Sequence, residues 1–304
     1  MSQEPSVRAF RIIVAPYELG RLREGVGRGP ERLLGAGAEE ALASRNAEVR
    51  SEVVVIGPSF GRSGKGDVDA SFALIREIAK RVRAAVDDGA FPVVLSGSCF
   101  VAVGVMAGLS EPAPAAVWLD AHADFNSPET STDGYFDGMG LAVLTGGAWQ
   151  GLLGTVPDAQ PLPECRVVLA GARDLDPHEE LRLAASTITH LRSEELRTPA
   201  ALTRAVKTIV PAVTGLYLHV DLDVLDLDVA RVNVYGARGG LNGAQLQNVV
   251  EAVCVDCPVR AISLTAYDPS YDVEQRVPPI ALDLLRTISE TAHDRPLKAV
   301  GLEE

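Results

Sequence analysis

The sequence predicts an α/β fold in which a mostly parallel sheet is covered on both faces by helices. Short runs rich in β-branched residues recur along the 304 residues and alternate with amphipathic stretches of helical length. The runs are almost continuously apolar, which is typical of strands buried on both faces of a sheet. No charge block, repeat or low-complexity stretch interrupts the chain, and we therefore expect one domain over residues 1–304.

The expected helices and strands alternate along the chain. The clearest helix covers residues 70–86, where Phe72, Ile75, Ile78 and Val82 recur close to the 3.6-residue period. Residues 57–66 (GPSFGRSGKG) are expected to form a loop and lack the spacing of a phosphate-binding loop. Other helices are expected at residues 177–185, 193–210, 242–253 and 278–292, and strands at residues 10–15, 52–56, 92–95, 115–119, 166–170, 215–220 and 259–264.

The composition excludes several classes of protein. The chain has 41 acidic and 28 basic residues and a net charge of −13, which argues against nucleic acid or an anionic membrane as a partner. It begins MSQEP, without the regions of a signal peptide, and its apolar runs are far shorter than a membrane span. Four cysteines in so long a chain do not form a disulfide scaffold. We therefore expect a soluble cytoplasmic protein.

Two acidic clusters directly follow apolar runs that are expected to be strands. Asp120, His122 and Asp124 stand at positions i, i+2 and i+4, so that strand alternation would point all three to one face. Asp221 and Asp223 repeat the pattern later in the chain. Ligands of parallel sheets collect beyond the carboxyl ends of the strands, and carboxylate with imidazole suits manganese, zinc, iron or cobalt.

Together the two clusters predict a pair of divalent ions. Such a pair can lower the pKa of a bridging water and aim the resulting hydroxide at a trigonal carbon. The alternative is that the residues are ordinary strand-end acids that make turns or cap helices. Because the pattern occurs twice, a metal site is favoured, and a two-metal hydrolase is the leading hypothesis.

Six segments resemble signatures of one enzyme family, in the expected order and over nearly the whole chain. The most specific are DAHAD at residues 120–124 and DLDVLD at residues 221–226. The chain resembles the arginase/agmatinase ureohydrolases in both. The other segments are GVGRGPERLL (25–34), VVLSGSCFVAVG (93–104), GARDLDP (171–177) and GGL (239–241).

The resemblance implies an arginase-like three-layer α/β/α fold with two manganese ions (Mn2+) per chain. It also implies a small-molecule substrate of the guanidine type, whose C–N bond is hydrolysed by a metal-bridging hydroxide. Assembly as a homo-oligomer, a trimer or a hexamer, is implied as well. Carried over to this sequence, the ligands of one ion are Asp120, Asp124 and Asp221, and those of the other are Asp120, His122, Asp221 and Asp223.

Two further residues belong to the second acidic segment. Asp226 matches an acid that supports the cluster in the family. His219 stands where the family commonly has a small residue, and we expect it to pack in the strand or to support a ligand.

Cys99 stands where the family has a metal-binding His in its GGDHS segment. A thiolate can bind divalent metals, so Cys99 is expected to be a substitute ligand. The alternative is a small buried residue beside a weakened site. A sulfur ligand would shift the metal preference towards zinc, iron(II) or cobalt (Zn2+, Fe2+ or Co2+).

Asp137 stands where the family has a His that is assigned to proton transfer. A carboxyl whose pKa is raised by burial can shuttle protons, which makes Asp137 a candidate catalytic residue together with Asp124. The alternative is a surface-loop acid without a catalytic role.

The positions that would recognise a guanidinium have changed. Ala266 replaces a Glu of the family, which removes a charge-assisted contact, and Asp268 lies on the other phase of the strand. Leu227 replaces a Pro, and residues 228–238 depart from the family's pattern, with Tyr235 near the substrate side. We therefore expect a substrate other than arginine or agmatine.

Other expected substrate contacts are partly kept. Asn126 and Asp176 match residues that bind the amino-acid end of arginine in arginases, and Asp133 adds negative charge at the mouth of the pocket. Because Pro177 follows Asp176, a helix N-cap is the alternative role for this acid.

Three functions stay open on the sequence. The first is a metal-dependent hydrolase of a modified guanidine or amidine, such as N-hydroxylated arginine, whose hydroxyguanidine is less basic. The second is a non-catalytic relative that serves as a subunit or binding protein, which Cys99, Asp137 and Ala266 favour. The third is a metal-dependent amide deacylase, which needs an electrophile such as Tyr235 or Tyr267 near the metal.

Overall fold

A parallel sheet forms the centre of the molecule. The computed structural model describes residues 9–43, 47–57, 67–209 and 213–293. Within these ranges eight strands form one sheet in the order β4-β1-β5-β10-β9-β6-β7-β8, and all paired neighbours are parallel. The strands are β1 (Ala9–Ala15), β4 (Glu48–Val53), β5 (Ala90–Ser96), β6 (Pro114–Leu119), β7 (Val167–Ala170), β8 (Thr189–Leu191), β9 (Gly215–Asp221) and β10 (Val259–Thr265).

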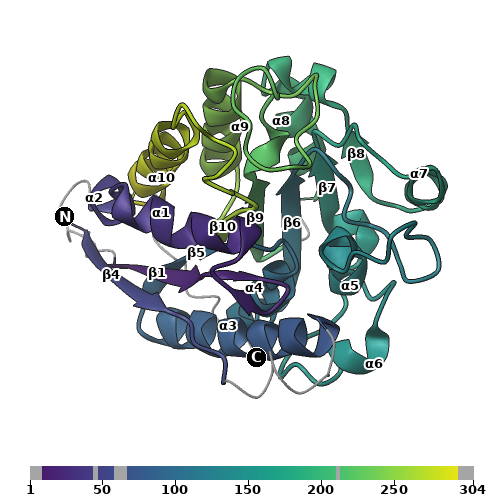
Figure 1. Ribbon diagram of the computed structural model, residues 1–304, viewed down its shortest axis with the longest axis horizontal. Coiled ribbons are helices and arrows are strands. Elements are labelled where there is room, and N and C mark those ends of the chain that lie inside the picture. Colours follow the sequence, from purple (N-terminus) through teal and green to yellow (C-terminus); the bar gives the residue numbers. More distant parts are fainter. Residues whose placement is uncertain (1–8, 44–46, 58–66, 210–212, 294–304) are drawn as a thin grey trace.

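Helices cover both faces of this sheet (Figure 1). One group shares a buried core with one face, and a second group shares another core with the opposite face. The expected three-layer α/β/α arrangement is therefore confirmed. The first group is α1 (Gly29–Gly35), α2 (Ala38–Leu42), α8 (Ala200–Ile209), α9 (Gly243–Asp256) and α10 (Val277–His293), and the second is α3 (Asp67–Asp87), α4 (Val101–Leu109), α5 (Gly140–Leu144), α6 (Gln150–Leu153) and α7 (Pro177–Ala184).

Helix α4 packs unusually closely on α3, the helix that the apolar period predicted. A Cβ atom at Gly104 would lie 2.4 Å from the carbonyl oxygen of Ile75, and one at Gly108 would lie 2.6 Å from that of Ala79. Only glycine fits at these two positions, so the two helices can approach each other at this distance. The contact fixes the start of α4, and with it Cys99, beyond the carboxyl end of β5.

Two local predictions have wrong bounds. The strand expected at residues 52–56 is β4 (Glu48–Val53), an edge strand whose exposed polar residues hide it from a search for apolar runs. The helix expected at residues 193–210 begins as a 3₁₀ helix (Ser193–Arg197), and α8 starts only at Ala200. Pro199 explains the break, because a residue before proline avoids the helical region, and Thr198 is extended here.

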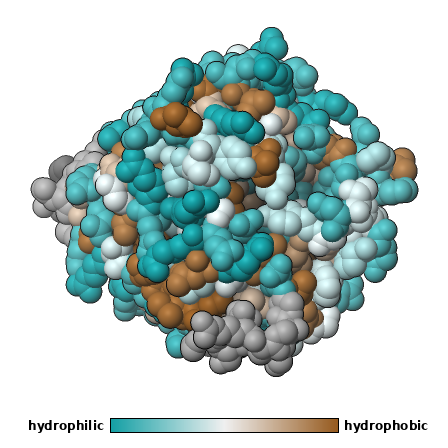
Figure 2. Space-filling view, viewed as in Figure 1, coloured by the Kyte–Doolittle hydropathy of each residue, from teal (hydrophilic) through white to brown (hydrophobic). Residues whose placement is uncertain are grey.

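Some expectations concern residues outside the described ranges. Of the loop expected at residues 57–66, only Gly57 is described, and Val210 and the amino-terminal residues 1–8 are also outside. No helix in the described part of the chain is long and apolar enough to cross a membrane. Figure 2 shows hydrophilic residues over most of the face seen in Figure 1, with hydrophobic residues in separate patches.

The sheet order brings the two acidic clusters together. Strand β6 pairs with β9, Leu119 lying opposite Val220, so the residues that follow both strands meet at one edge. Strand β10 pairs with β9 on its other side, Thr265 lying opposite Asp221. The candidate centre therefore lies where β5, β10, β9 and β6 end, at the carboxyl edge of the sheet.

Candidate metal centre

The two acidic clusters meet through turns that their own carboxylates stabilise. Oδ1 of Asp120 accepts a hydrogen bond from the backbone N–H of His122 (2.7 Å), and Oδ1 of Asp221 accepts one from that of Asp223 (2.7 Å). Strand β6 ends at Leu119, so the expectation that strand alternation aligns Asp120, His122 and Asp124 is wrong. The residues converge because the chain turns, not because the strand continues.

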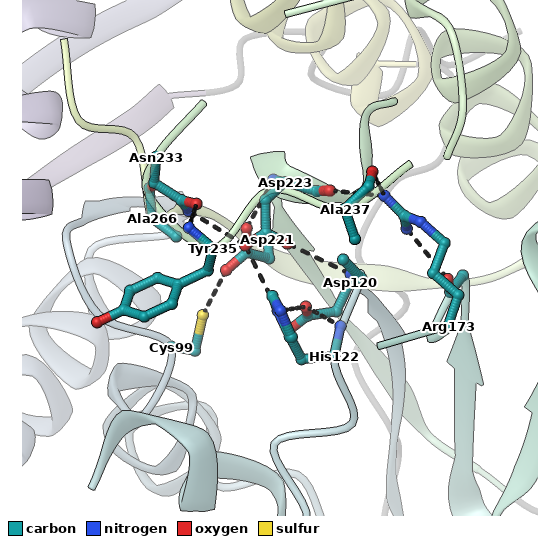
Figure 3. A network of polar contacts seen from close by, with 12 residues as sticks. Cys99, Asp120, His122, Arg173, Asp221, Asp223, Asn233, Tyr235, Ala237 and Ala266 are labelled. Atoms are coloured by element: carbon teal, nitrogen blue, oxygen red, sulfur yellow. Dashed lines mark hydrogen bonds and ion pairs between the residues drawn. The ribbon is translucent and has the colours of Figure 1, made fainter. Parts of the chain in front are cut away.

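Two overlapping groups of potential metal ligands lie at this edge. Figure 3 shows Cys99, Asp120, His122 and Asp223 of these groups. In one group, Nδ1 of His122 lies 3.4 Å from Oδ1 of Asp120 and 3.5 Å from Oδ2 of Asp223. The other group consists of Cys99, Asp120 and His219. Within each group the ligand atoms lie within 4.8 Å of one another. Asp120 belongs to both groups, which is the arrangement that a carboxylate shared by two ions requires.

Asp124 presents an unpartnered carboxylate oxygen to the same place. Among the described residues, its buried Oδ2 has no hydrogen-bond partner. The backbone of Asp124 is left-handed (φ 50°), and its carbonyl oxygen accepts from the N–H groups of Leu141 (2.9 Å) and Ala142 (3.1 Å) at the start of α5. Burial and the carboxylates of Asp120 and Asp137 raise the pKa of Asp124 well above its ordinary value. A cation would relieve both the missing contact and the repulsion.

Cys99 faces the acids. Its Sγ lies 2.9 Å from Oδ2 of Asp221, to which it donates, and 3.2 Å from Oγ1 of Thr265. Burial, followed by the charges of Asp221 and Asp124, raises the pKa of the Cys99 thiol well above its ordinary value. Without an ion the thiol therefore keeps its proton, whereas a bound ion would replace that proton.

His122 holds a proton between the two acids. Burial lowers the pKa of His122, but the carboxylates of Asp223 and Asp120 outweigh burial and raise it to about 10. A divalent ion can take the place of this proton, because a metal-bound imidazole is neutral. Oxygen, nitrogen and sulfur donors, with the unpartnered oxygen of Asp124, thus form a set that fits divalent metal ions.

A pocket opens onto these side chains and encloses about 450 Å³, including its opening to solvent. Tyr235 forms part of its wall, with its ring 5.4 Å from that of Tyr135 and 6.5 Å from that of His122 between centroids. None of the described lining residues is Lys or Arg. The lining residues are Val26, Cys99, His122, Asp124, Tyr135, Asp137, Gly138, Asp221, Asp223, Asn233, Tyr235 and Ala266.

Arginases are among the known proteins that this chain resembles in sequence. The sequence profile of the arginase family matches residues 8–289. The chain belongs to the arginase family. It is 27% identical over 296 residues to an arginase from Bacillus caldovelox, and the aligned region covers 93% of this chain and 98% of that arginase.

Solved structures of this family share the fold. An arginase from Bacillus cereus superposes with a TM-score of 0.84 at 24% identity, over 96% of this chain and all of that chain (100%). A formimidoylglutamase from Bacillus subtilis superposes with a TM-score of 0.75 at 15% identity, over 97% of this chain and 90% of that chain. The arginase-like fold predicted from the sequence is thus confirmed.

The structure tests one part of the alternative for Asp137, its expected position at the surface. It is buried, lines the pocket, and accepts a hydrogen bond from the N–H of Phe100 (3.2 Å) at the start of α4. Burial raises the pKa of Asp137 to about 7. The expectation of a surface position is therefore wrong, whereas proton transfer by Asp137 stays a prediction.

Two residues of the candidate centre were missed in the sequence. Asn233 donates from Nδ2 to Oδ2 of Asp223 (3.1 Å) and to the carbonyl oxygen of Ala266 (2.9 Å). Arg173 donates to the carbonyl oxygens of Asp223 (3.1 Å) and Ala237 (2.9 Å), so it fastens the changed segment 228–238 to the acids (Figure 3). The arginine stands in the GARDLDP segment, which was the available signal, but no pattern marked the asparagine.

Three expected substrate contacts lie beside the pocket rather than in its lining. Nδ2 of Asn126 donates to Oδ2 of Asp176 (3.1 Å), so these two residues are brought together as a pair. Asp176 is also the N-cap residue of α7, with Pro177 behind it, as the alternative required. Asp133 accepts from the N–H of Tyr135 (2.9 Å) and from Ser131 Oγ (3.1 Å), so its exposed carboxylate shapes its own loop.

Other candidate residues point away from the pocket. Asp226 was expected to support the acids of the centre. Its carboxylate instead accepts from the N–H groups of Gly239 (2.7 Å) and Gly240 (2.9 Å) and thereby holds the loop. Tyr267 donates to Asp272 (3.1 Å) and is buried. Asp268 accepts from Ser270, which leaves the position of Ala266 without a replacement carboxylate.

Proposed function

We propose that this arginase-family protein is a hydrolase that uses two divalent ions to cleave a C–N bond in a modified guanidine or amidine. The observation that carries the proposal is the sharing of Asp120 between two ligand groups that open into one pocket. The relatives that the chain resembles along its length are arginases, which supports hydrolysis as the reaction class.

The proposed ligands divide between the two ions. Asp120, His122, Asp221 and Asp223 would hold one, and Cys99, Asp120, Asp124 and Asp221 the other. When bound, such a pair supplies Lewis acidity and lowers the pKa of a water molecule that it shares. Manganese suits the carboxylates, whereas the thiol of Cys99 favours zinc, iron(II) or cobalt.

Asp137 is proposed to move the proton. Its carboxyl group is at the pocket, with a pKa raised by burial to about 7, so it can accept and return a proton at neutral pH. The leaving nitrogen of an amidine must gain a proton before it departs. Asp137 accepts a hydrogen bond from the N–H of Phe100, the residue after Cys99, and lines the pocket together with Cys99. From this position it would deliver the proton to the leaving nitrogen.

The pocket wall narrows the class of substrate. Carboxylates line the pocket together with the rings of Tyr135 and Tyr235, and aromatic rings attract planar or cationic groups. At Ala266 the wall offers no carboxylate for a strongly basic guanidinium. A hydroxyguanidine or an amidine, which is planar but less basic, therefore fits better than arginine.

The proposal is tested by metal-dependent hydrolysis of a panel of compounds. We would incubate protein loaded with manganese or zinc with arginine, agmatine, N-hydroxyarginine and formimidoyl amino acids, and measure urea, hydroxyurea, amine and ammonia. Asp124→Asn should abolish the activity, whereas Asp158→Asn, a change of an exposed acid paired with Arg83, should keep it.

The alternative is a non-catalytic member of the family. The hydrogen bond from Cys99 to Asp221 favours it, because a protonated thiol satisfies this acid without an ion. No hydrolysis of any compound by metal-loaded protein would support this alternative. Assembly as a homo-oligomer, trimer or hexamer, and a cytoplasmic location stay predictions, the first of which light scattering would test.

A further inference from the structure

His219 is a buried imidazole one layer beneath the candidate centre. It lies on β9 two residues before Asp221, so the two side chains are on the same face of the strand. Its ring stacks on that of Trp118, with 3.7 Å between the centroids and 19° between the planes. Trp118 in turn donates from Nε1 to Oδ2 of Asp120 (3.0 Å). The ring is therefore held rigidly beside an acid that both ligand groups share.

The two nitrogens of this imidazole have different surroundings. Nδ1 lies 2.9 Å from the hydroxyl of Tyr217 and 3.0 Å from that of Ser263, and these two hydroxyls also contact each other. In the described part of the chain, Nε2 has one long contact of 3.4 Å, with Oγ1 of Thr265. The same oxygen lies 3.2 Å from Sγ of Cys99. Nδ1 is thus oriented by hydroxyl groups, while Nε2 and the thiol of Cys99 both contact Oγ1 of Thr265.

This arrangement is typical of a metal-binding histidine. Such a residue commonly has its second nitrogen fixed by a hydrogen bond, which sets the tautomer and the direction of the ring. Ligand atoms of Cys99, Asp120 and His219 lie within 4.8 Å of one another. Tetrahedral bonds of about 2.0–2.3 Å would put such atoms roughly 3.3–3.8 Å apart, so each pair of ligand atoms would have to approach by at most about 1.5 Å.

We propose that His219 donates Nε2 to the ion held by Cys99 and Asp120, which gives that position a mixed thiolate, imidazole and carboxylate set. The inference rests on the proposed metal site and adds a ligand to it. Sulfur and nitrogen donors favour zinc and cobalt over manganese, so the position should select the softer ions. A histidine that served packing alone would not need an almost unpartnered nitrogen that shares a contact with a thiol.

The proposal is tested by X-ray absorption at the zinc edge of the wild-type chain loaded with two zinc ions. With His122 and His219 both bound, the spectrum should show one imidazole per zinc on average, together with sulfur at about 2.3 Å. Without His219 the average falls to half an imidazole per zinc. This readout needs no variant, and half an imidazole per zinc, or failure to bind zinc, would overturn the proposal.

Variants then assign the imidazole to its residue. His219→Gln should weaken zinc binding at this position by more than about 100-fold, beyond the 10–100-fold effect of a residue that only orients a ligand. Manganese binding should change less. His190→Gln is the matched control, because His190 contacts the carbonyl oxygen of Ala172 outside the centre (3.1 Å). Circular dichroism and thermal unfolding with chelator would establish that both variants fold.

The outcomes separate this inference from the proposed function. Zinc affinity of His219→Gln within about threefold of the wild type, with hydrolysis intact, would end the inference and leave the function. One imidazole per zinc without hydrolysis of any compound would keep the inference and end the proposed function.

Discussion

Asn233 donates a hydrogen bond from Nδ2 to Oδ2 of Asp223, over 3.1 Å. The same amide group donates to the carbonyl oxygen of Ala266 (2.9 Å), and its Oδ1 accepts from the N–H of Tyr235 (2.8 Å). One buried side chain thus joins an acid of the candidate centre to two walls of the pocket. The link connects metal binding to the shape of the substrate site.

We expect Asn233→Ala to weaken the binding of a metal ion at Asp223. Without the amide, Asp223 loses a donor that fixes the direction of its carboxylate, and residues that orient a ligand contribute about 10–100-fold in affinity. Competition with a fluorescent chelator would measure this change. Asn242→Ala, at the N-cap of α9, is the control and should lower stability but not affinity. Equal affinities of wild type and Asn233→Ala would show that the carboxylate needs no such support.

Asp137→Asn should lower kcat by about 10²–10⁴-fold without changing metal content. Burial raises the pKa of Asp137 to about 7, so the proton-accepting carboxylate forms only as the pH rises through this value. The wild-type rate should therefore increase between about pH 6 and pH 8, and the Asn variant should lack this increase. A variant that retained both the rate and the pH profile would remove Asp137 from proton transfer.

Tyr235 separates hydrolysis of amidines from the deacylase hypothesis. A deacylase would need the hydroxyl group of Tyr235 as an electrophile. In our account only the ring of Tyr235 matters, because it lines the pocket beside Tyr135. Tyr235→Phe should therefore change kcat by less than about 10-fold, and Tyr235→Ala should mainly raise KM. Tyr271→Phe, beside Arg231 and away from the pocket lining, is the matched control. If Tyr235→Phe instead slowed turnover by about 100-fold or more, the deacylase would be favoured.

Glu179 should make the metal-free protein less stable as the pH rises. It is buried and accepts from the N–H of Phe125 (2.8 Å), and burial raises its pKa to about 7. The folded state therefore binds more protons than the unfolded state between about pH 4.5 and 7. The contribution of protonated Glu179 to the free energy of unfolding is fully present below the pKa that Glu179 has in the unfolded chain. It is lost as the pH rises through about 7, the pKa in the folded state.

Urea unfolding in chelator would measure this contribution. From pH 4.5 to 7.5, Glu179→Gln should gain roughly 3 kcal/mol relative to the wild type, because it cannot ionise. Glu180→Gln, exposed on the same helix, should follow the wild type. If the free energies of unfolding of the wild type and Glu179→Gln changed in parallel with pH, the carboxyl group of Glu179 would have the same pKa in the folded and unfolded states, which would contradict this prediction.

The sequence predicted what depends on local pattern. Buried strands such as β9 are continuous apolar runs, and apolar residues recur in α3 at the helical period. The three-layer arrangement could therefore be predicted from these two patterns. Asp120 directly follows β6 and Asp221 is the last residue of β9, and parallel pairing brings strand ends together. Their convergence was therefore predictable without coordinates.

What was missed depends on contacts between distant segments. Asn233 reaches Asp223 through a loop with no periodic signal, and Arg173 binds carbonyl groups some 50 and 64 residues away. Asp226 was expected to support the acids because it matches an acid of the family's motif, but its carboxylate accepts from the N–H of Gly239. Strand β8 has only three residues, too few for any pattern.

Metal content per chain tests the central claim most directly. Protein purified without chelator and dialysed against manganese or zinc would be measured by mass spectrometry, beside Asp124→Asn. Our account predicts about two ions per wild-type chain, and fewer in the variant because its unpartnered oxygen is replaced. One ion or fewer per wild-type chain under both conditions would contradict a centre built on two ligand groups that share Asp120.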